Sequence, residues 1–261
     1  MHLVAIRPRP GDEAPERIAA LCEGSALPEY EARTRVRVLG DWPGVLLSTA
    51  ELPRAIEIEA HLKKLGFDAW TMPGRGRPRH LVARRFEIRG GTIHAEDDDG
   101  GRVTITPLAA RLTLEATDFG YHVDQVLEHE AGAGTVGAMA ARALLGLPNR
   151  PSSPRVVERR RERRERFVRL FAAGTVPVDF RASALQYTAL QMPVAPTRVE
   201  NFGRALAMLR QVLPGVRHDV RLVARSAQTR ILGPALAPQR HLETAIALLG
   251  APPERPGDPY R

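Results

Sequence analysis

Short apolar runs and amphipathic segments alternate along the first 73 residues of the chain. Three of the apolar runs predict strands: Leu3–Ile6, Val45–Ser48 and Phe67–Met72. Between the first two runs, residues 14–23 have the apolar spacing of a helix. Ser48 and Glu51 have the spacing of a capping box, so another helix is expected to begin there and to end at Gly66.

The segment Tyr30–Leu39 fits two different structures. Its less polar residues alternate with charged residues, as in a half-buried strand: Tyr30, Ala32, Thr34, Val36 and Val38. Ala32, Val36 and Leu39 also share one face of a helix. A strand here would give a ferredoxin-like βαββαβ unit, and a helix would give βααβαβ.

Two stretches of this region resemble a known domain. Residues 26–36, Ala-Leu-Pro-Glu-Tyr-Glu-Ala-Arg-Thr-Arg-Val, are similar to the Gly-Leu-x-x-x-Glu-Ala-Lys-x-x-Val helix of the C-terminal domain of the bacterial ribosomal stalk protein. Residues 55–69, which contain His-Leu-Lys-Lys-Leu-Gly-Phe-Asp-Ala, resemble the last helix and strand of that domain. The sequence departs from the pattern at Arg33 and in the insertion at residues 40–44.

The resemblance implies a helix in the ambiguous segment and a βααβαβ module at residues 1–73. The Clp-protease adaptor has a similar fold, and both families use the fold to bind other proteins. The implied role of this module is therefore protein binding rather than catalysis.

After a Gly/Pro/Arg linker at residues 73–80, alternating patterns predict a small antiparallel β segment at residues 80–118. Four strands are expected in it: Phe86–Arg89, Thr92–Glu96, Val103–Thr106 and Leu112–Glu115. The run from Asp97 to Gly101 has the composition of a turn that joins the second and third of these strands. Residues 119–153 are expected to be a Gly/Ala/Pro-rich connection.

Residues 154–250 predict a basic module of helices and strands, followed by a loose tail at residues 251–261. The charged run comes first, and two strands are expected after it, at Val176–Phe180 and Leu185–Thr188. Thr197 and Glu200 form a capping box, and apolar residues then repeat on one helical face: Val199, Phe202, Leu206, Leu209 and Leu213. A strand at Val220–Ala224 and a final helix at residues 239–249 complete an α+β protein.

Every residue from Glu158 to Arg166 is charged. If this run is helical, Arg160, Arg163 and Arg164 lie in the same stripe as the apolar residues that flank it, whereas the glutamates lie opposite. Three interpretations remain open: an exposed helix with its own i,i+4 ion pairs, internal pairing with the acids of residues 96–99, or binding of an anionic partner. Arginines at positions 75, 77, 79, 84 and 85 would extend a basic surface.

The charge distribution supports binding of an anionic partner by the C-terminal part only. The chain has a formal charge of +8, and its basic and acidic residues number 9 and 11 in residues 1–73, 10 and 10 in residues 74–150, and 19 and 9 in residues 151–261. The last part therefore carries +10, which favours polyanions such as nucleic acid. Against nucleic acid, no recognised binding motif is present and aromatic residues make up only 5% of the chain.

Local motifs for cofactors, metals and catalysis fail on their context. Gly132-Ala-Gly134-Thr-Val-Gly137 matches a dinucleotide-binding loop, but no buried strand precedes it and no acidic residue follows at the required distance. The cluster from His122 to Glu130 lacks metal-ligand spacing, and the single cysteine, Cys22, precludes a disulfide. The sequence thus predicts no catalytic residue, no cofactor and no metal.

These observations favour a non-enzymatic cytoplasmic interaction or adaptor protein with a protein partner. The alternative is sequence-independent binding of nucleic acid or another polyanion through Arg160, Arg163 and Arg164. The N-terminus lacks the pattern of a signal peptide, and the most apolar stretch, residues 131–147, is too short to span a membrane.

Overall fold

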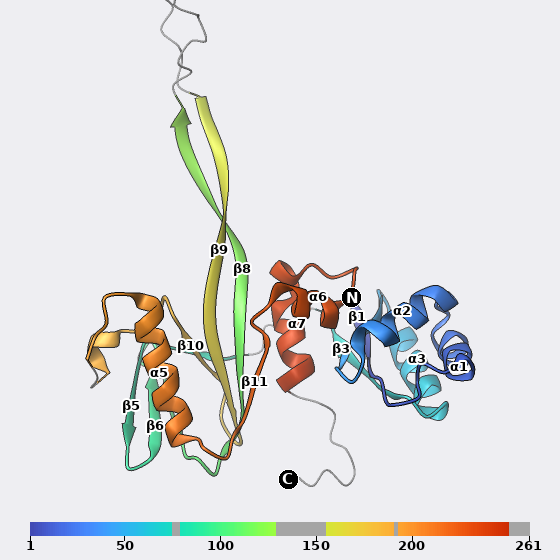
Figure 1. The fold of residues 1–261 in the computed structure, drawn as a ribbon, viewed down its shortest axis with the longest axis horizontal. Coiled ribbons are helices and arrows are strands. Elements are labelled where there is room, and N and C mark those ends of the chain that lie inside the picture. The colour runs from blue at the N-terminus through green and yellow to red at the C-terminus, as the bar shows by residue number, and fades with distance from the viewer. Residues whose placement is uncertain (75–78, 129–154, 191–192, 251–261) are drawn as a thin grey trace, which may run out of the picture. The chain divides into compact units, whose positions relative to one another are not determined.

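The structure is a computed structural model that describes residues 1–74, 79–128, 155–190 and 193–250 (Figure 1). The described residues form helices and three β-sheets, which confirms the predicted α+β class. By its internal contacts the chain divides into two compact units. One combines residues 1–119 with 164–261, and the other comprises residues 120–163. Each unit is described by itself.

The N-terminal sheet has the order β2-β1-β3, with antiparallel neighbours. Its strands and the three helices that accompany them follow the order βααβαβ: β1 (His2–Arg7), α1 (Pro15–Ser25), α2 (Glu29–Leu39), β2 (Gly44–Thr49), α3 (Leu52–Lys64) and β3 (Asp68–Pro73). The ambiguous segment is thus a helix. It buries Ala32, Val36 and Leu39, the three residues that share one helical face, and leaves Tyr30 and Val38 exposed.

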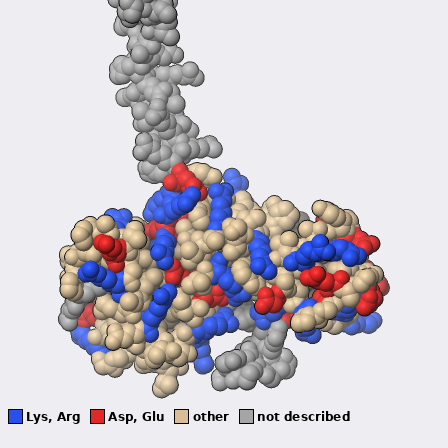
Figure 2. Space-filling view, in the orientation of Figure 1, with Lys and Arg blue, Asp and Glu red and all other residues tan. Residues whose placement is uncertain are grey.

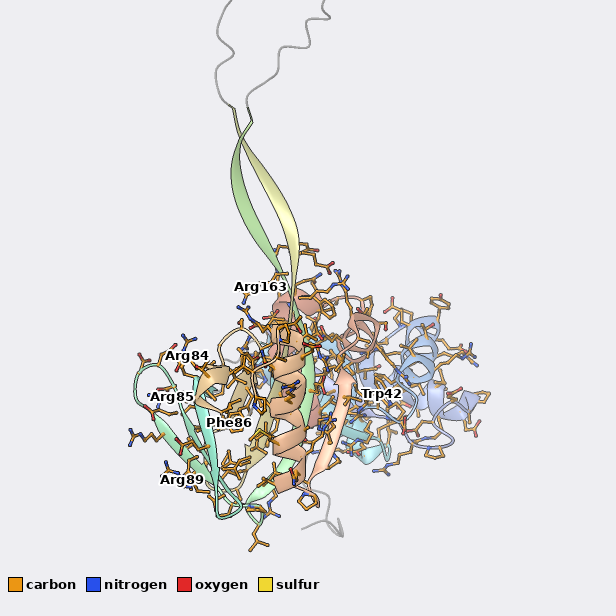
Figure 3. The ribbon with its side chains drawn as sticks, turned by 60° about the vertical axis from the view of Figure 1, so that its left-hand side comes forward. Trp42, Arg84, Arg85, Phe86, Arg89 and Arg163 are labelled. Atoms are coloured by element: carbon orange, nitrogen blue, oxygen red, sulfur yellow. The ribbon has the colours of Figure 1, made fainter. Side chains whose placement is uncertain are left out.

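A second antiparallel sheet has the order β5-β6-β7. Its strands match three of the four predicted in this region: β5 (Arg85–Arg89), β6 (Thr92–Glu96) and β7 (Arg102–Ile105). Asp97 closes the predicted turn, since its Oδ1 accepts hydrogen bonds from the amides of Asp99 (3.0 Å) and Gly101 (2.7 Å). Phe86 of β5, which is labelled in Figure 3, packs edge-on against Phe180 with ring centroids 5.1 Å apart, and so anchors this sheet to its neighbour.

The third sheet has five strands in the order β11-β8-β9-β10-β4. They are β4 (Leu81–Ala83), β8 (Ala110–Glu128), β9 (Arg155–Ala172), β10 (Val178–Arg181) and β11 (Arg217–Leu222). The two outer pairs, β10 with β4 and β11 with β8, are parallel, and β10 is antiparallel to β9. Because β8 continues to Glu128, the predicted connection at residues 119–153 is wrong in its first part. Residues 129–154 lie outside the described residues.

The predicted arginine helix is also wrong, because this segment is the strand β9. Local pattern suggested a helix, whereas β9 lies between β8 and β10 in the five-stranded sheet, and its pairing with β10 places Arg169 directly opposite Asp179. Glu165 and Arg169 are four residues apart and would pair on a helix, but they form no ion pair here. Glu165 instead accepts hydrogen bonds from the amide and the hydroxyl of Ser183.

The C-terminal part of the described chain contains the helices α5 (Arg198–Val212), α6 (Arg225–Leu232) and α7 (Pro238–Gly250). Thr197 caps α5 as predicted, accepting a hydrogen bond from the Glu200 amide at 3.2 Å. Val199 is exposed, however, because the first turn of α5 does not enter the core. α6 had no counterpart in the sequence prediction, and the strand expected at Leu185–Thr188 is replaced by the short 3-10 helix η1 (Tyr187–Ala189).

The N-terminal sheet and the C-terminal helices share a hydrophobic core. Leu3 and Ala5 of β1 and Val45 of β2 belong to the same buried cluster as Ile231 of α6 and Ile246 of α7. The opposite face of β1 buries Val4 and Ile6 against α1, α2 and α3. Residues 1–73 are therefore covered on both faces of their sheet, on one by their own helices and on the other by α6 and α7.

Candidate functional site

The three arginines predicted to form a binding stripe do not share a face. Arg163 and Arg164 are both exposed, but they are successive residues of β9 and so project to opposite faces of the strand. The Arg164 guanidinium lies 5.9 Å from the ring centroid of Phe119. The Arg160 side chain lies outside the described residues. The single helical stripe on which the polyanion hypothesis was based is therefore absent.

Two of the acids expected to face these arginines, Glu96 and Asp98, pair with other arginines instead. Glu96 forms ion pairs with Arg85 (3.0 Å) and Arg102 (3.4 Å), and Asp98 pairs with Arg84 (3.2 Å). Arg84 and Arg85, which were expected to extend a basic surface, are thus partly neutralised (Figure 3). On the face shown in Figure 2, basic and acidic side chains are interspersed rather than gathered in one patch.

Arg169 of β9 is the centre of a buried ionic network. It is 1% exposed and donates to both oxygens of Asp179 (2.5 and 2.9 Å) and both oxygens of Glu243 (2.5 and 3.0 Å). Burial alone would lower the pKa of Arg169, but the hydrogen bonds and charges of these two carboxylates raise it. This network joins β9, β10 and α7. The Nε, Nη1 and Nη2 atoms of Arg169 all donate to carboxylate oxygens within it. We therefore assign it to folding rather than to binding.

A second cluster surrounds Glu115, a carboxylate of β8 whose side chain is 3% exposed. Glu115 pairs with Arg166, and with Arg210 at 3.3 Å. The adjacent cavity, lined by Thr113 and His218 among others, has a volume of about 30 Å³. That volume accommodates about one water molecule, which is too little for a substrate.

His218 in this cluster is expected to stay neutral at neutral pH. Burial lowers its pKa, and the positive charge of Arg210 lowers it further, against the opposing effect of Glu115. The hydrogen bonds agree with a neutral ring. The guanidinium of Arg210 can only donate, so Nε2 accepts from it, and Nδ1 then donates to Thr113 Oγ1 at 2.6 Å.

A pH titration followed by NMR should therefore give His218 a pKa below 6.5. Arg210→Gln should raise that pKa, because it removes the neighbouring positive charge. Below pH 6.5 the unfolded chain binds the proton more readily than the folded chain, so His218 lowers stability as the pH falls. A pKa at or above 6.5, or one that Arg210→Gln leaves unchanged, would contradict this assignment.

A large cavity forms a groove between α2 and α6, with a volume of about 720 Å³. Tyr30, Thr34 and Val38 line it from α2, and Ser226, Thr229 and Gly233 are among the residues that line it from α6 and its C-terminal end. Each of these sets repeats at helical spacing, so each helix presents one continuous face to the groove. We call this cavity the α2–α6 groove.

Two apolar side chains in the α2–α6 groove are exposed to solvent. Tyr30 is 80% exposed and Val38 is 42% exposed, although both lie on a helix whose other face is fully buried. Leu46 of β2 lies at the base of the groove and is buried. These apolar residues fall outside the buried stripe of Ala32, Val36 and Leu39. The presence of apolar residues outside the buried stripe of α2 was the sequence signal for the groove. It identified only the wall formed by α2, because α6 was not predicted.

Arg35 closes the base of the α2–α6 groove. It is 8% exposed and donates to the carbonyls of Val45 (2.5 Å), Arg230 (2.6 Å) and Ile231 (2.6 Å). The last two carbonyls belong to the C-terminal end of α6, where a positive charge is favourable. Burial lowers the pKa of Arg35 to about 10. Its partners are carbonyls, and no carboxylate of the described residues forms an ion pair with it.

Arg230 adds a second positive charge to the groove. Its Nη2 donates to the Leu39 carbonyl at 2.7 Å, and its guanidinium lies 4.1 Å from the centroid of the Trp42 ring. Its Nε is buried and has no hydrogen-bond partner among the described residues. With Arg35 and the single acidic residue Glu31, the groove lining carries two positive charges and one negative charge. Its chemistry is therefore apolar with a positive base.

The remaining sequence motifs contribute no site. The glycine motif at Gly132–Gly137 lies outside the described residues, as do the side chains of the cluster from His122 to Glu130. Among the residues that are described, no three His, Cys, Asp or Glu side chains come together in a way that could hold a metal ion. The helices of this described part are too short or too polar to cross a membrane.

Comparison of the chain with protein-family models, with curated proteins and with solved structures gave no significant match.

Proposed function

We propose that this protein is a non-enzymatic interaction protein whose α2–α6 groove binds an amphipathic helix of a partner protein. The observation that carries the proposal is the pair of exposed apolar side chains, Tyr30 and Val38, which line a groove of about 720 Å³. Exposed apolar patches with polar rims are typical of protein-binding surfaces. Aromatic residues such as tyrosine are enriched among those that dominate binding energy.

The shape of the groove favours a helical occupant. Tyr30, Thr34 and Val38 are spaced by four residues, so the α2 wall extends over about 12 Å at the helical rise of ~1.5 Å per residue. A wall of two helical turns matches a ligand that presents apolar residues at positions i, i+4 and i+7.

The charge of the groove favours an acidic occupant. The guanidinium groups of Arg35 and Arg230 have carbonyl partners and form no ion pair with a described carboxylate. A carboxylate on the partner would complement both positive charges. The proposed ligand is therefore a helix with one apolar face and acidic residues beside that face.

Selection of ligands from a phage-displayed library of random 16-residue peptides, on the full-length protein, tests the proposal. We expect the selected peptides to be acidic and amphipathic. Replacing Tyr30 and Val38 together by serine should weaken their binding about 10- to 100-fold, since two central apolar contacts of about 1 kcal/mol or more each are lost. The matched control is Ile56→Ser, because Ile56 is also an apolar helical residue and is 51% exposed.

Two outcomes would overturn the proposal. In the first, no selected peptide distinguishes the double serine variant from the Ile56→Ser control. In the second, light scattering shows that the wild-type protein self-associates and that the double variant is monomeric, which would make a second copy of this chain the occupant. Both substitutions are at exposed positions, so unchanged folding can be verified by circular dichroism.

A further inference from the structure

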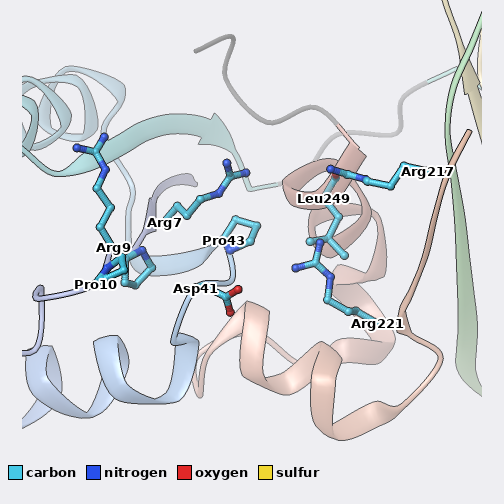
Figure 4. Close-up of a pocket in the computed structure, with 9 residues that line it drawn as sticks. Arg7, Arg9, Pro10, Asp41, Pro43, Arg217, Arg221 and Leu249 are labelled. Atoms are coloured by element: carbon cyan, nitrogen blue, oxygen red, sulfur yellow. The ribbon is translucent and has the colours of Figure 1, made fainter. Parts of the chain in front are cut away.

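A second cavity of the first compact unit has a very different lining. It has a volume of about 370 Å³ and is lined by four arginines: Arg7, Arg9, Arg217 and Arg221 (Figure 4). Asp41 is the single acidic residue of the lining, so the formal excess is three positive charges. Pro43 and Leu249 contribute apolar surface. We call this cavity the arginine pocket.

The arginines come from two distant parts of the chain. Arg7 and Arg9 belong to the Arg-Pro-Arg-Pro sequence at the end of β1, and Arg217 and Arg221 belong to β11. Arg217 and Arg221 both line the pocket, although the register of β11 shifts between Asp219 and Leu222, whereas His218 lies 3.6 Å from Glu115. No local motif reveals this juxtaposition.

The β1 side of the arginine pocket is held rigidly. The two prolines restrict the backbone around Arg9. Asp12 also closes a turn there: its Oδ2 accepts from the Arg9 amide at 2.8 Å, and its own amide donates to the Arg9 carbonyl at 3.0 Å. Asp12 is 4% exposed and is held by Arg17 at 2.9 Å. The backbone that presents Arg9 is therefore fixed before any ligand binds.

The β11 side of the pocket is also preorganised. Asp219 accepts hydrogen bonds from Nε (3.0 Å) and Nη2 (2.6 Å) of Arg221. The Arg221 guanidinium also lies 5.1 Å from the centroid of the Trp42 ring. Burial would raise the pKa of Asp219, but the hydrogen bonds and charge of Arg221 lower it, so the pair stays charged. Arg217 donates to the Leu249 carbonyl at 3.3 Å.

Donors remain for a ligand after these contacts are counted. Each guanidinium has five N–H groups. On Arg217, the Leu249 carbonyl accepts from one of them. On Arg221, Asp219 accepts from those on one edge. A planar guanidinium group suits an oxyanion, to which it can donate two parallel hydrogen bonds.

We infer that the arginine pocket binds a phosphate group, with Arg9 and Arg217 as its most accessible donors. Such a group would come either from a small phosphorylated molecule or from the backbone of a nucleic acid. This inference is independent of the α2–α6 groove, because the two cavities share no lining residue. The pocket also differs from the predicted stripe of Arg160, Arg163 and Arg164, since none of those residues lines it.

Titration calorimetry of the full-length protein with inorganic pyrophosphate tests the inference, with sodium chloride of equal ionic strength as the reference. We expect binding of one pyrophosphate per chain. Replacing Arg9 and Arg217 together by glutamine should weaken this binding at least tenfold. Both side chains are exposed, so the substitutions should leave folding intact. The matched control is Arg37→Gln with Arg111→Gln, which removes the same charge from exposed positions outside the pocket.

A second arm with single-stranded (dT)20 distinguishes the two sources of phosphate. If the ligand is a nucleic acid, (dT)20 binds, pyrophosphate competes with it, and the Arg9/Arg217 variant shows a smaller salt dependence. If the ligand is a small molecule, pyrophosphate binds and (dT)20 does not displace it. Equal weakening by the pocket variant and the control, or no heat beyond that of the chloride reference, would overturn the inference.

Discussion

Replacing Arg169 by methionine is expected to lower the free energy of unfolding by about 3 kcal/mol. The substitution leaves Asp179, which is 0% exposed, without its principal partner, and it also removes the charge that faces Glu243. Breaking one side of a buried ion pair costs ~3–5 kcal/mol in general, because the remaining charge stays buried. We place this effect at the lower end because Arg181 still contacts Asp179 at 3.2 Å.

Urea unfolding of the wild type and the variant measures this effect. The matched comparison is the double variant Arg169→Met/Asp179→Leu, in which neither charge of the central pair is left buried. It should regain much of the lost stability, since apolar residues of similar volume replace buried ion pairs with little loss. A loss below about 1 kcal/mol in Arg169→Met would show that the network contributes little to folding.

Replacing Arg35 by methionine is likewise expected to cost about 3 kcal/mol of unfolding free energy. The variant loses three charge-assisted hydrogen bonds, to the carbonyls of Val45, Arg230 and Ile231. Hydrogen bonds to charged groups contribute ~1.5–3 kcal/mol each, and the cost of burying the guanidinium, which lowers its pKa to about 10, offsets part of that sum. Arg35 thus holds the end of α6 against α2 and β2.

Arg33→Met is the control for this prediction. Arg33 also lies on α2, but it is partly exposed and pairs with Glu29 at i,i+4 spacing, an interaction that contributes less than about 0.5 kcal/mol. Urea unfolding should therefore separate the two variants clearly. If Arg33→Met and Arg35→Met were equally stable, the three carbonyl contacts of Arg35 would not be the link between these elements.

The elements that the sequence predicted correctly depend on signals within a few residues of each other. Thr197 caps α5 through an amide three residues away, and Asp97 closes its turn through an amide four residues away. The helical spacing of Ala32, Val36 and Leu39 likewise lies within three turns. Such signals act through the local backbone and persist in almost any tertiary environment.

The charged run was assigned wrongly because its partners lie on other strands. Its helical interpretation considered only residues three and four positions apart, whereas Arg166 at the end of the run pairs with Glu115 of β8, and Arg169 just beyond it pairs with Asp179 of β10. A signal was present in the sequence: Val178-Asp179-Phe180-Arg181 complements Phe167-Val168-Arg169-Leu170 in charge and apolar alignment across a turn that contains Gly174.

By itself, the sequence determined the α+β class, the order of the N-terminal elements once the resemblance favoured a helix at Tyr30–Leu39, and the antiparallel β5–β7 sheet. Only the tertiary structure decided that the charged run is a strand and that α6 faces α2. It also decided that arginines from β1 and β11 line one pocket. The physical reason is range: caps, turns and periodicity act between near neighbours, whereas strand pairing, burial and the meeting of charges depend on residues up to about 200 positions apart, such as Arg35 and Ile231.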